Sequence, residues 1–330
     1  MGSENRIGMV STWKVRCGIA SYTENLTRAL AKHGVETYIV RLNRFGSKTS
    51  DYLEHLATRR IPKIPLLHIQ NEYGLYQGKE AVFYQALKMI HPEIKIATTV
   101  HGIGMKQQDE VIARFSDLVI VHNEYQKRLF EWPCVVIHHG VQLRKPIEKE
   151  RAKKLMDLEG EKVVGCFGFI APHKGIEDLL YAASKIRDVK FLIAGGYHVE
   201  AETGYMMKLK KMAPPNVIWT GYVEDAELPK VFGCMDLCIY PSRFISESGA
   251  LLTIIGFGKA LIARDLPPNR EKPVMLFKTK EDLVDCVKQV LDDEELRMKL
   301  EEGSKRYAKA NSWMKIAEQH IKHYKKILQS

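Results

Sequence analysis

The stretch DLCIYPSRFISESGALLTIIGFGKALIARD, residues 236–265, joins two apolar segments through a small-residue loop and an apolar helical segment. DLCIYPS and KALIARD have the apolar character of buried strands. Glu247 comes just before Ser248, Gly249 and Ala250, which lead into the helical segment. A strand, a helix and a second strand in this order are typical of a parallel sheet covered by helices on both faces.

The same alternation continues along most of the chain. RIGMVS, TYIVRL, LLHIQ, IKIATTVH, LVIVHN and CVVIHHG form a first set of predicted strands, and KVVGCFGF, KFLIAGG, VIWTG, DLCIYPS and KALIARD form a second set. The charged segment 142–161 separates the two sets. The sequence therefore predicts an α/β protein with two Rossmann-like, doubly wound parallel-sheet domains, residues 1–150 and 151–311, whose carboxyl strand ends face each other across a cleft.

Composition is that of a folded protein, with 45% apolar and 27% charged residues in a chain of 330 residues. Apolar runs of about ten residues are too short to span a bilayer. The first residues lack a secretory signal, so we expect a cytoplasmic protein. Six scattered cysteines without a Cys-x-x-Cys pair indicate reduced thiols rather than a zinc site or a disulfide framework.

A formal net charge of +10 is compatible with nucleic acid, anionic lipid or a phosphorylated substrate as partner. The sequence lacks the basic and aromatic pattern of nucleic-acid readers, so we expect no nucleic-acid partner. Lys14, Arg16, Arg28 and Lys32 make the first domain basic. Peripheral contact with the inner face of a membrane is therefore one reading, and a solvated helix face is the other.

Two loops that follow predicted strands have the character of anion sites. Gly18 precedes a helical segment, from about residue 21 to residue 33, that Ser21 or Thr23 could cap. In FGFIAPHKGIEDLL, residues 167–180, Lys174 stands just before a predicted helix, where a phosphate would bind. A plain strand-to-helix turn and a solvated surface lysine are the alternatives.

The loop around Glu247 is a third such place. Ser248, Gly249 and Ala250 are small enough to present successive backbone N–H groups to an anion. Glu247 would accept hydrogen bonds from hydroxyl groups or stabilise positive charge that develops on a sugar. The alternative role for Glu247 is a carboxylate that interacts with the helix dipole.

Nine segments in order resemble family 4 glycosyltransferases and cover nearly the whole chain. They are CGIASYTENL, HIQNEYGLY, TTVHGIG, DLVIVHNEYQKRLF, VIHHGV, GFIAPHKGIEDLL, VIWTGYVEDAELPKVFGCMDLCIYPS, SESGALLTIIGFGKALIARD and SWMKIAEQHIKHYKKIL. The chain is most similar to the bacterial and archaeal mannosyltransferase-like branch. The resemblance implies a GT-B fold with the donor held mainly by the second domain, the acceptor by the first, and a C-terminal helix, about 312–328, packed back on the first domain.

The implied reaction is transfer of a hexose from a nucleoside-diphosphate sugar to a hydroxyl of a saccharide, a lipid-linked or a small-molecule acceptor, with retention, without a required metal and without a cofactor. Mannose from GDP-mannose is the donor that the branch suggests, and a UDP-sugar is the other choice. The resemblance gives His101, Lys174 and Glu247 the catalytic roles: His101 contacts the donor sugar, Lys174 neutralises the leaving phosphate and Glu247 binds sugar hydroxyls.

The other implied donor contacts come from the loops. The Gly18 loop would lie under the diphosphate, the N–H groups of Ser248, Gly249, Ala250 and Leu251 would hold the phosphates, and Tyr222 would lie beside the base. His68, Asn71 and Glu72 follow a strand and could touch the acceptor, or form only a hydrogen-bonded strand end.

Two positions depart from the family pattern. Ile255 stands eight residues after Glu247, where many members have the glutamate that binds ribose, and Phe169 replaces the arginine of a Gly-Arg phosphate clamp. Arg243 could supply the missing charge. The departures favour a second reading, a sugar-nucleotide-binding module with weak or no turnover. A third reading, an enzyme of the glycogen phosphorylase type, would require bound pyridoxal.

Overall fold

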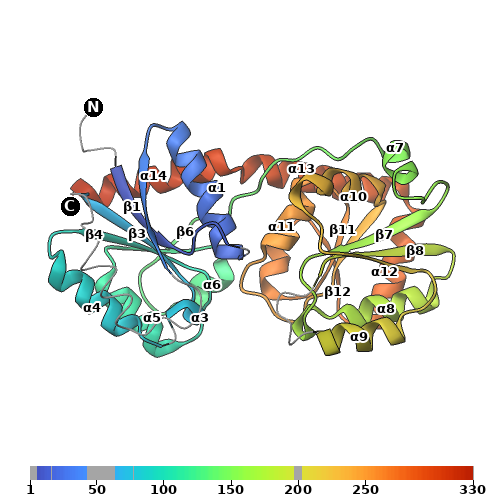
Figure 1. The fold of residues 1–330 in the computed structure, drawn as a ribbon, viewed down its shortest axis with the longest axis horizontal. Coiled ribbons are helices and arrows are strands. Elements are labelled where there is room, and N and C mark those ends of the chain that lie inside the picture. The colour runs from blue at the N-terminus through green and yellow to red at the C-terminus, as the bar shows by residue number, and fades with distance from the viewer. Residues whose placement is uncertain (1–5, 16, 43–63, 77, 197–202, 330) are drawn as a thin grey trace. The chain divides into compact units, whose positions relative to one another are not determined.

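The computed structural model describes residues 6–15, 17–42, 64–76, 78–196 and 203–329. It divides into two compact units. Unit 1 comprises residues 1–140 and 311–330, and unit 2 comprises residues 141–310. Each unit contains one six-stranded sheet with helices packed around it (Figure 1). The prediction of an α/β chain with two doubly wound parallel sheets is confirmed.

Unit 1 has the strand order β2-β1-β3-β4-β5-β6, and every pair in it is parallel. Its strands are β1 (Arg6–Ser11), β2 (Glu36–Arg41), β3 (Leu66–Asn71), β4 (Lys95–Val100), β5 (Leu118–Val121) and β6 (Val135–Val136). Its helices are α1 (Gly18–Lys32), α3 (Tyr73–Tyr76), α4 (Glu80–Ile90), α5 (Lys106–Phe115), α6 (Glu124–Leu129) and α14 (Trp313–Gln329). The C-terminal helix α14 thus packs in unit 1, against α1.

Unit 2 has the order β12-β11-β10-β7-β8-β9, again with parallel pairs throughout. Its strands are β7 (Lys162–Phe167), β8 (Val189–Ala194), β9 (Val217–Gly221), β10 (Leu237–Tyr240), β11 (Leu261–Arg264) and β12 (Met275–Phe277). Its helical segments are α7 (Lys149–Lys154), η2 (Pro172–Lys174), α8 (Ile176–Lys185), α9 (Thr203–Met212), η4 (Asp225–Glu227), α10 (Leu228–Cys234), α11 (Gly249–Gly256), η5 (Pro267–Glu271), α12 (Lys280–Asp292) and α13 (Glu294–Ala310). The strand order reverses between β7 and β10, and ligands of such sheets bind at that reversal.

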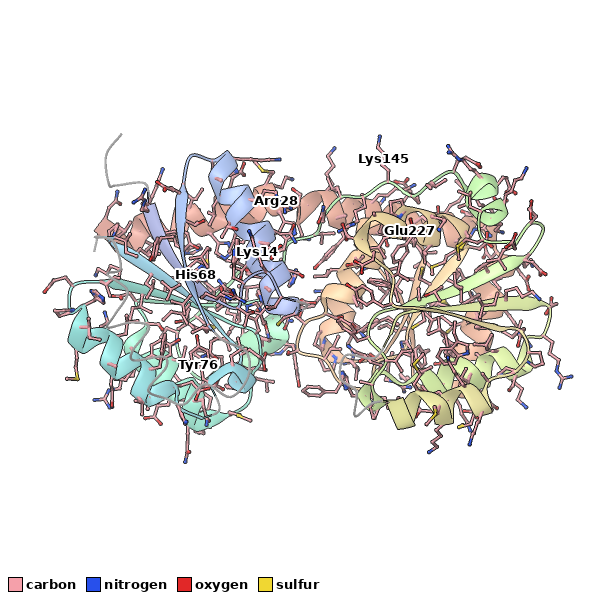
Figure 2. The ribbon with its side chains drawn as sticks, in the orientation of Figure 1. Lys14, Arg28, His68, Tyr76, Lys145 and Glu227 are labelled. Carbon is pink, nitrogen blue, oxygen red and sulfur yellow. The ribbon has the colours of Figure 1, made fainter. Side chains whose placement is uncertain are left out.

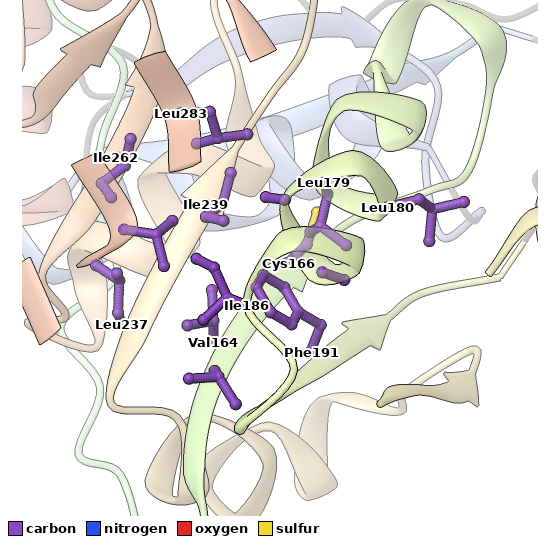
Figure 3. Close-up of a cluster of buried hydrophobic side chains, with 14 of the residues drawn as sticks. Val164, Cys166, Leu179, Leu180, Ile186, Phe191, Leu237, Ile239, Ile262 and Leu283 are labelled. Atoms are coloured by element: carbon purple, nitrogen blue, oxygen red, sulfur yellow. The ribbon is translucent and has the colours of Figure 1, made fainter. Parts of the chain in front are cut away.

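Two apolar clusters fill unit 2, because its central strands bury side chains on both faces. Phe191 and Leu179 belong to one cluster, which Figure 3 shows between β7, β10 and α8. Phe232 and Ile255 belong to the other, which includes α10 and α11. Helix α11 is thus held on the sheet by its apolar side, and its first turn lies at the carboxyl ends of the strands.

Local boundaries differ from the predictions at two places. Helix α1 begins at Gly18 with Cys17 as its N-cap, so the prediction that Ser21 or Thr23 caps this helix is wrong. Thr23 lies inside the helix, where its hydroxyl donates to the Ile19 carbonyl (2.8 Å). Strand β12 was not predicted, because three residues are too few for a periodic signal.

The segment 142–161, predicted as a linker, packs on unit 2. Ala152 and Leu158 are buried in its core. The Lys153 ammonium donates to Asp236 (2.9 Å), and Lys149 pairs with the other oxygen of the same carboxylate. Asp236 also accepts a hydrogen bond from the Val163 N–H (2.9 Å) at the start of β7. One buried carboxylate therefore ties α7 to the amino ends of β7 and β10.

We expect Asp236→Asn to lower the free energy of unfolding by about 3–5 kcal/mol, because it leaves the buried Lys153 ammonium without its counter-ion. Burial opposes the charge of Asp236, but hydrogen bonds from Lys149, Lys153 and the Val163 N–H outweigh it and hold its pKa below 3.8. The stabilisation is therefore complete above the unfolded-state pKa and is lost as pH falls through the folded-state pKa.

Urea unfolding of the wild type and of Asp236→Asn, at several pH values from neutral to acid, measures this difference in the free energy of unfolding. The matched control is Asp292→Asn, since Asp292 is 73% exposed in its pair with Lys162. An equal shift of the unfolding midpoint in both variants would contradict the anchoring role of Asp236.

Candidate functional site

The loops that follow β7 and β10 meet at the strand reversal of unit 2. The Arg243 N–H donates to the His173 carbonyl (2.8 Å), and the Ser242 hydroxyl donates to the same oxygen (3.2 Å). Gly175 has φ +67°, and a Cβ on it would lie 2.4 Å from the Pro241 carbonyl oxygen. Only glycine allows the two loops to approach this closely.

Lys174 lies in this junction, at the end of η2. Its ammonium donates to the Tyr240 hydroxyl (3.4 Å) and lies 5.7 Å from the centre of the Tyr240 ring. Tyr240 is the last residue of β10 and is 2% exposed. The buried ring therefore holds the lysine at the carboxyl edge of the sheet, while the lysine itself is half-buried.

The first turn of α11 lies beside the loop after β7. Ser248 is the N-cap, and its hydroxyl accepts from the Leu251 N–H (3.3 Å). The Leu251 N–H is thus engaged inside the protein. The N–H groups of Gly249 and Ala250 have no acceptor among the described residues. A Cβ placed on Gly168 would be 3.2 Å from the Ala250 Cβ, so this turn borders the loop after β7.

Glu247 forms a buried ion pair that the sequence did not suggest. The Lys272 ammonium donates to Glu247 Oε2 (2.9 Å), and the two side chains are 1% and 5% exposed. The other oxygen of Glu247 accepts from the Ser248 N–H (3.0 Å). Burial opposes the charge on Lys272, but the adjacent Glu247 carboxylate outweighs it and raises the Lys272 pKa above its usual value. The pair fixes the carboxylate directly before α11.

Arg243 is 46% exposed and already has acidic neighbours. Its guanidinium lies 3.4 Å from Glu177 and 3.3 Å from Asp178. Asp178 also pairs with Arg264. The positive charge that a phosphate would meet at Arg243 is therefore partly balanced.

The two departures from the family pattern have distinct surroundings. Ile255 is completely buried in the core of unit 2, so this position of α11 faces the sheet. Phe169 stacks on Tyr222 with ring centroids 6.2 Å apart, after β7 and β9 respectively. Tyr222 is 45% exposed. An aromatic pair therefore stands where the family pattern has the arginine of its phosphate clamp.

In unit 1, His101 follows β4 and is 9% exposed. Its Nε2 lies 2.9 Å from Gln70 Oε1, and its Nδ1 lies 3.2 Å from His122 Nε2. The edge of the Tyr22 ring packs on it. Burial, followed by the neighbouring histidines, lowers the His101 pKa well below 6.5, so the ring is neutral at pH 7. Both ring nitrogens are used inside unit 1.

The three residues predicted at the acceptor site separate in the structure. His68 lies in the middle of β3, inside unit 1 (Figure 2), where Thr99 and Tyr324 hydroxyls contact its ring nitrogens at 2.7 and 2.6 Å. Asn71 ends β3, is fully buried, and accepts the His101 N–H at its backbone (2.9 Å). Glu72 is close to Gly102, and burial raises its pKa. Asn71 and Glu72 thus lie with His101 at the carboxyl edge, and His68 lies behind it.

Gly18, the first residue of α1, is exposed. Among the basic residues of the first domain, Arg16 lies outside the described residues. Within the described ranges, no three His, Cys, Asp or Glu side chains are grouped to hold a metal ion.

Among the described residues, no helix combines the length and the apolar character needed to cross a bilayer.

The two six-stranded parallel sheets define a GT-B fold. Residues 161–293 match the family model described as "Glycosyl transferases group 1". The matched segment lies in unit 2, and it supports the resemblance to glycosyltransferases at the level of group 1.

Two curated relatives match. One is the processive diacylglycerol alpha-glucosyltransferase of Acholeplasma laidlawii, 29% identical over 163 residues, which are 46% of this chain and 49% of the relative. The other is the alpha-D-kanosaminyltransferase of Streptomyces kanamyceticus, 26% identical over 44% of this chain and 41% of that protein. The matches span about half the length of these relatives or less.

Solved structures share the fold over the full length. Sucrose-phosphate synthase from Thermosynechococcus elongatus has a TM-score of 0.81 at 17% identity, with 99% of this chain and 100% of that chain covered. Anabaena HepE in complex with UDP and glucose has a TM-score of 0.79 at 14% identity, with 98% and 100% covered.

The sequence reasoning did not single out Lys272, Gln70 or His122. No motif marks a lysine that pairs with a carboxylate 25 positions earlier. Gln70 and His122 each sit at or after the carboxyl end of a predicted strand, and that position was the available signal.

We expect Lys272→Met to lower the free energy of unfolding by about 3–5 kcal/mol, because the buried Glu247 carboxylate then loses the Lys272 ammonium. Adding Glu247→Gln should recover part of the loss, because it removes the uncompensated charge. Urea unfolding of the two single variants and the double variant gives the coupling free energy.

Lys305→Met is the matched control, because Lys305 is 57% exposed in its pair with Glu302 and should leave the unfolding midpoint unchanged. Strictly additive effects of Lys272→Met and Glu247→Gln would show that the pair is not coupled.

Proposed function

We propose that the chain is a retaining hexosyltransferase that moves a sugar from a nucleoside-diphosphate donor to a hydroxyl acceptor without a required metal. The observation that carries the proposal is the junction of the loops after β7 and β10. There Lys174 and the first turn of α11 share the carboxyl edge at the strand reversal. This junction lies inside the segment that matches the group 1 family model.

The chemistry of donor cleavage suits these groups. Breaking the bond between sugar and phosphate leaves negative charge on the diphosphate and positive charge on the sugar ring. Lys174 and the N–H groups of Gly249 and Ala250 would stabilise the leaving diphosphate, because they are oriented before the reaction begins. The acceptor hydroxyl would attack from the face that the diphosphate leaves, with that diphosphate as base.

Glu247 would act through the carboxylate that Lys272 holds in place, binding donor hydroxyls or opposing the charge on the sugar ring. Tyr222, stacked on Phe169, would lie beside the nucleobase. Arg243 would add charge near the phosphates, shared with Glu177 and Asp178.

Unit 1 would supply the remaining contacts. His101 would meet the donor sugar through its main chain or ring edge, because both ring nitrogens are hydrogen-bonded within the unit. The Gly18 turn would approach the diphosphate. Glu72 and Asn71 would lie next to the acceptor, and His68 would support them from inside the sheet.

Two donors are supported by different observations. The resemblance to the mannosyltransferase-like branch supports GDP-mannose. The HepE complex with UDP and glucose supports a UDP-sugar, and the name of the Acholeplasma glucosyltransferase supports glucose as that sugar. A lipid-linked acceptor is supported by the first relative's name and by exposed Arg28 and Lys32 on α1, of which Arg28 is labelled in Figure 2.

A second candidate is a sugar-nucleotide-binding module with weak or no turnover. The specific observations in its favour are the nearly buried carboxylate of Glu247, the balanced charge of Arg243 and the core position of Ile255. This module would bind a donor through Lys174 and α11 but would not transfer its sugar.

We expect thermal unfolding of the protein to shift upward with one nucleoside diphosphate of a panel, because a ligand that binds only the folded state stabilises it. Lys174→Ala should weaken that affinity by about tenfold or more, since it removes a charged donor from the phosphate. Titration of the unfolding temperature against GDP, UDP and ADP, with and without EDTA, is the measurement.

Lys154→Ala is the control, because Lys154 is an exposed lysine on α7 in the same unit. If no nucleotide raises the unfolding temperature, both proposals, the transferase and the binding module, are contradicted. A shift without sugar transfer would leave the binding module.

A further inference from the structure

A chain of buried polar side chains runs through unit 1 from α14 to β6. The Tyr324 hydroxyl contacts His68 Nδ1 (2.6 Å), and His68 Nε2 lies 3.2 Å from the amide nitrogen of Gln70. The Gln70 amide oxygen lies 2.9 Å from His101 Nε2. His101 Nδ1 contacts His122 Nε2 (3.2 Å), and His122 Nδ1 faces the Ile137 carbonyl (3.2 Å).

All five side chains are buried, and none is more than 9% exposed. They belong to α14, to β3, and to the positions that directly follow β4 and β5. Buried polar groups in such a chain need a donor and an acceptor at every contact, because water does not compensate a mismatch. The protons of the chain can therefore be assigned by counting.

When Gln70 Oε1 faces His101, it is not possible to give every contact one donor and one acceptor. His101 Nε2 must donate to that oxygen, so His101 Nδ1 accepts and His122 Nε2 donates. A neutral His122 then turns an unprotonated Nδ1 toward the Ile137 carbonyl, and two acceptors face each other. At the other end, the Gln70 amide donates to His68 Nε2, His68 Nδ1 donates to Tyr324, and the Tyr324 proton has no acceptor among the described residues.

Turning the Gln70 amide by half a turn removes both conflicts. Tyr324 then donates to His68 Nδ1, and His68 Nε2–H is shared between Thr99 Oγ1 (2.7 Å) and Gln70 Oε1. The Gln70 amide donates to His101 Nε2. Among the contacts of the described residues, the turn gives up the weak contact of the amide with Met9 Sδ (3.2 Å).

Beyond Gln70, hydrogen bonds are donated in the same direction up to the Ile137 carbonyl, where the series ends. His101 Nδ1–H donates to His122 Nε2, and His122 Nδ1–H donates to the Ile137 carbonyl. Each of the contacts named above, from Tyr324 to Ile137, then has one donor and one acceptor, with His68, His101 and His122 neutral. The lowered pKa values of His68 and His101, caused first by burial, agree with neutral rings.

We propose that Gln70 and Tyr324 are positioning residues for His101. They fix it as the Nδ1–H tautomer. They do so through a series of hydrogen bonds that starts at Tyr324 on the C-terminal helix and in which each side chain donates to the next. The main chain of His101 is held as well, by the Asn71 carbonyl (2.9 Å) and the Gln126 amide (3.3 Å). The role of His101 in transfer rests on the proposed function, but its tautomer does not.

The direct test is ¹⁵N–¹H correlation NMR of the full-length protein labelled at histidine, which separates protonated from unprotonated ring nitrogens. The expected result is Nδ1–H for His101 and His122 and Nε2–H for His68. The opposite pattern, Nε2–H for His101 and His122 with Nδ1–H for His68, would overturn the proposal, as would an imidazolium at His101. This measurement needs no variant and no substrate.

A matched pair of variants tests the part played by Gln70. In Gln70→Glu the carboxylate cannot donate, so His101 should change to Nε2–H or to the imidazolium. Gln126→Glu makes the same change at another buried glutamine that touches only the His122 N–H and the His101 carbonyl, so the His101 tautomer should stay. An unchanged His101 in Gln70→Glu, or the same change in both variants, would overturn it.

Activity then tests the link to transfer. Once a donor is known, we expect Gln70→Glu to lower kcat by about tenfold or more with little change in KM, because the altered proton or charge on the His101 ring would disturb the contact with the donor sugar that the proposed function gives it. If the wild type binds no nucleotide, the proposed function fails and the tautomer assignment still stands. If transfer is unaffected while His101 changes tautomer, the positioning role is overturned.

Discussion

The constraint on which unit 2 depends is that all its strands are parallel and that their order reverses between β7 and β10. Parallel strands end at one edge of a sheet, so every loop that follows a strand is brought to the same place. The close approach of Gly175 to the Pro241 carbonyl then joins the two loops at the reversal. That junction places Lys174 and the first turn of α11 at the same edge of the sheet. Helix α11 is fixed by its packing on the sheet, and Lys174 is fixed by the buried Tyr240 ring.

The site residues of the two units are held by different kinds of buried polar contact. Unit 2 buries full charges and pairs them, as Lys272 with Glu247 and Lys153 with Asp236. Unit 1 buries neutral rings and joins them by hydrogen bonds from Tyr324 to Ile137. A buried ion pair fixes one carboxylate, because separating the charges is costly. A neutral chain instead fixes the tautomer of each ring, because one wrong proton leaves a mismatch at a neighbouring contact.

Strand positions were predictable because both sheets are buried on both faces. Such strands have runs of apolar residues, such as LLHIQ and KVVGCF. The place of Lys174 at the carboxyl edge was predictable, because it comes in the loop after a predicted strand. Helix caps were harder, since Ser21 and Thr23 have capping side chains but the chain already turns at Cys17. The partners of Glu247 and His68 could not be predicted, because Lys272 and Tyr324 meet them only after folding, with no fixed spacing.

The most direct test of a retaining transferase is ¹H NMR of slow donor hydrolysis, with water in place of the acceptor. Each α-linked nucleotide sugar, GDP-mannose and UDP-glucose first, is mixed with the protein, and the anomeric proton of the released sugar is followed before the anomers equilibrate. Retention predicts that the α-anomer forms first, together with an equal amount of nucleoside diphosphate. Initial formation of the β-anomer would contradict a retaining mechanism, and no release from any donor would contradict sugar transfer by this chain.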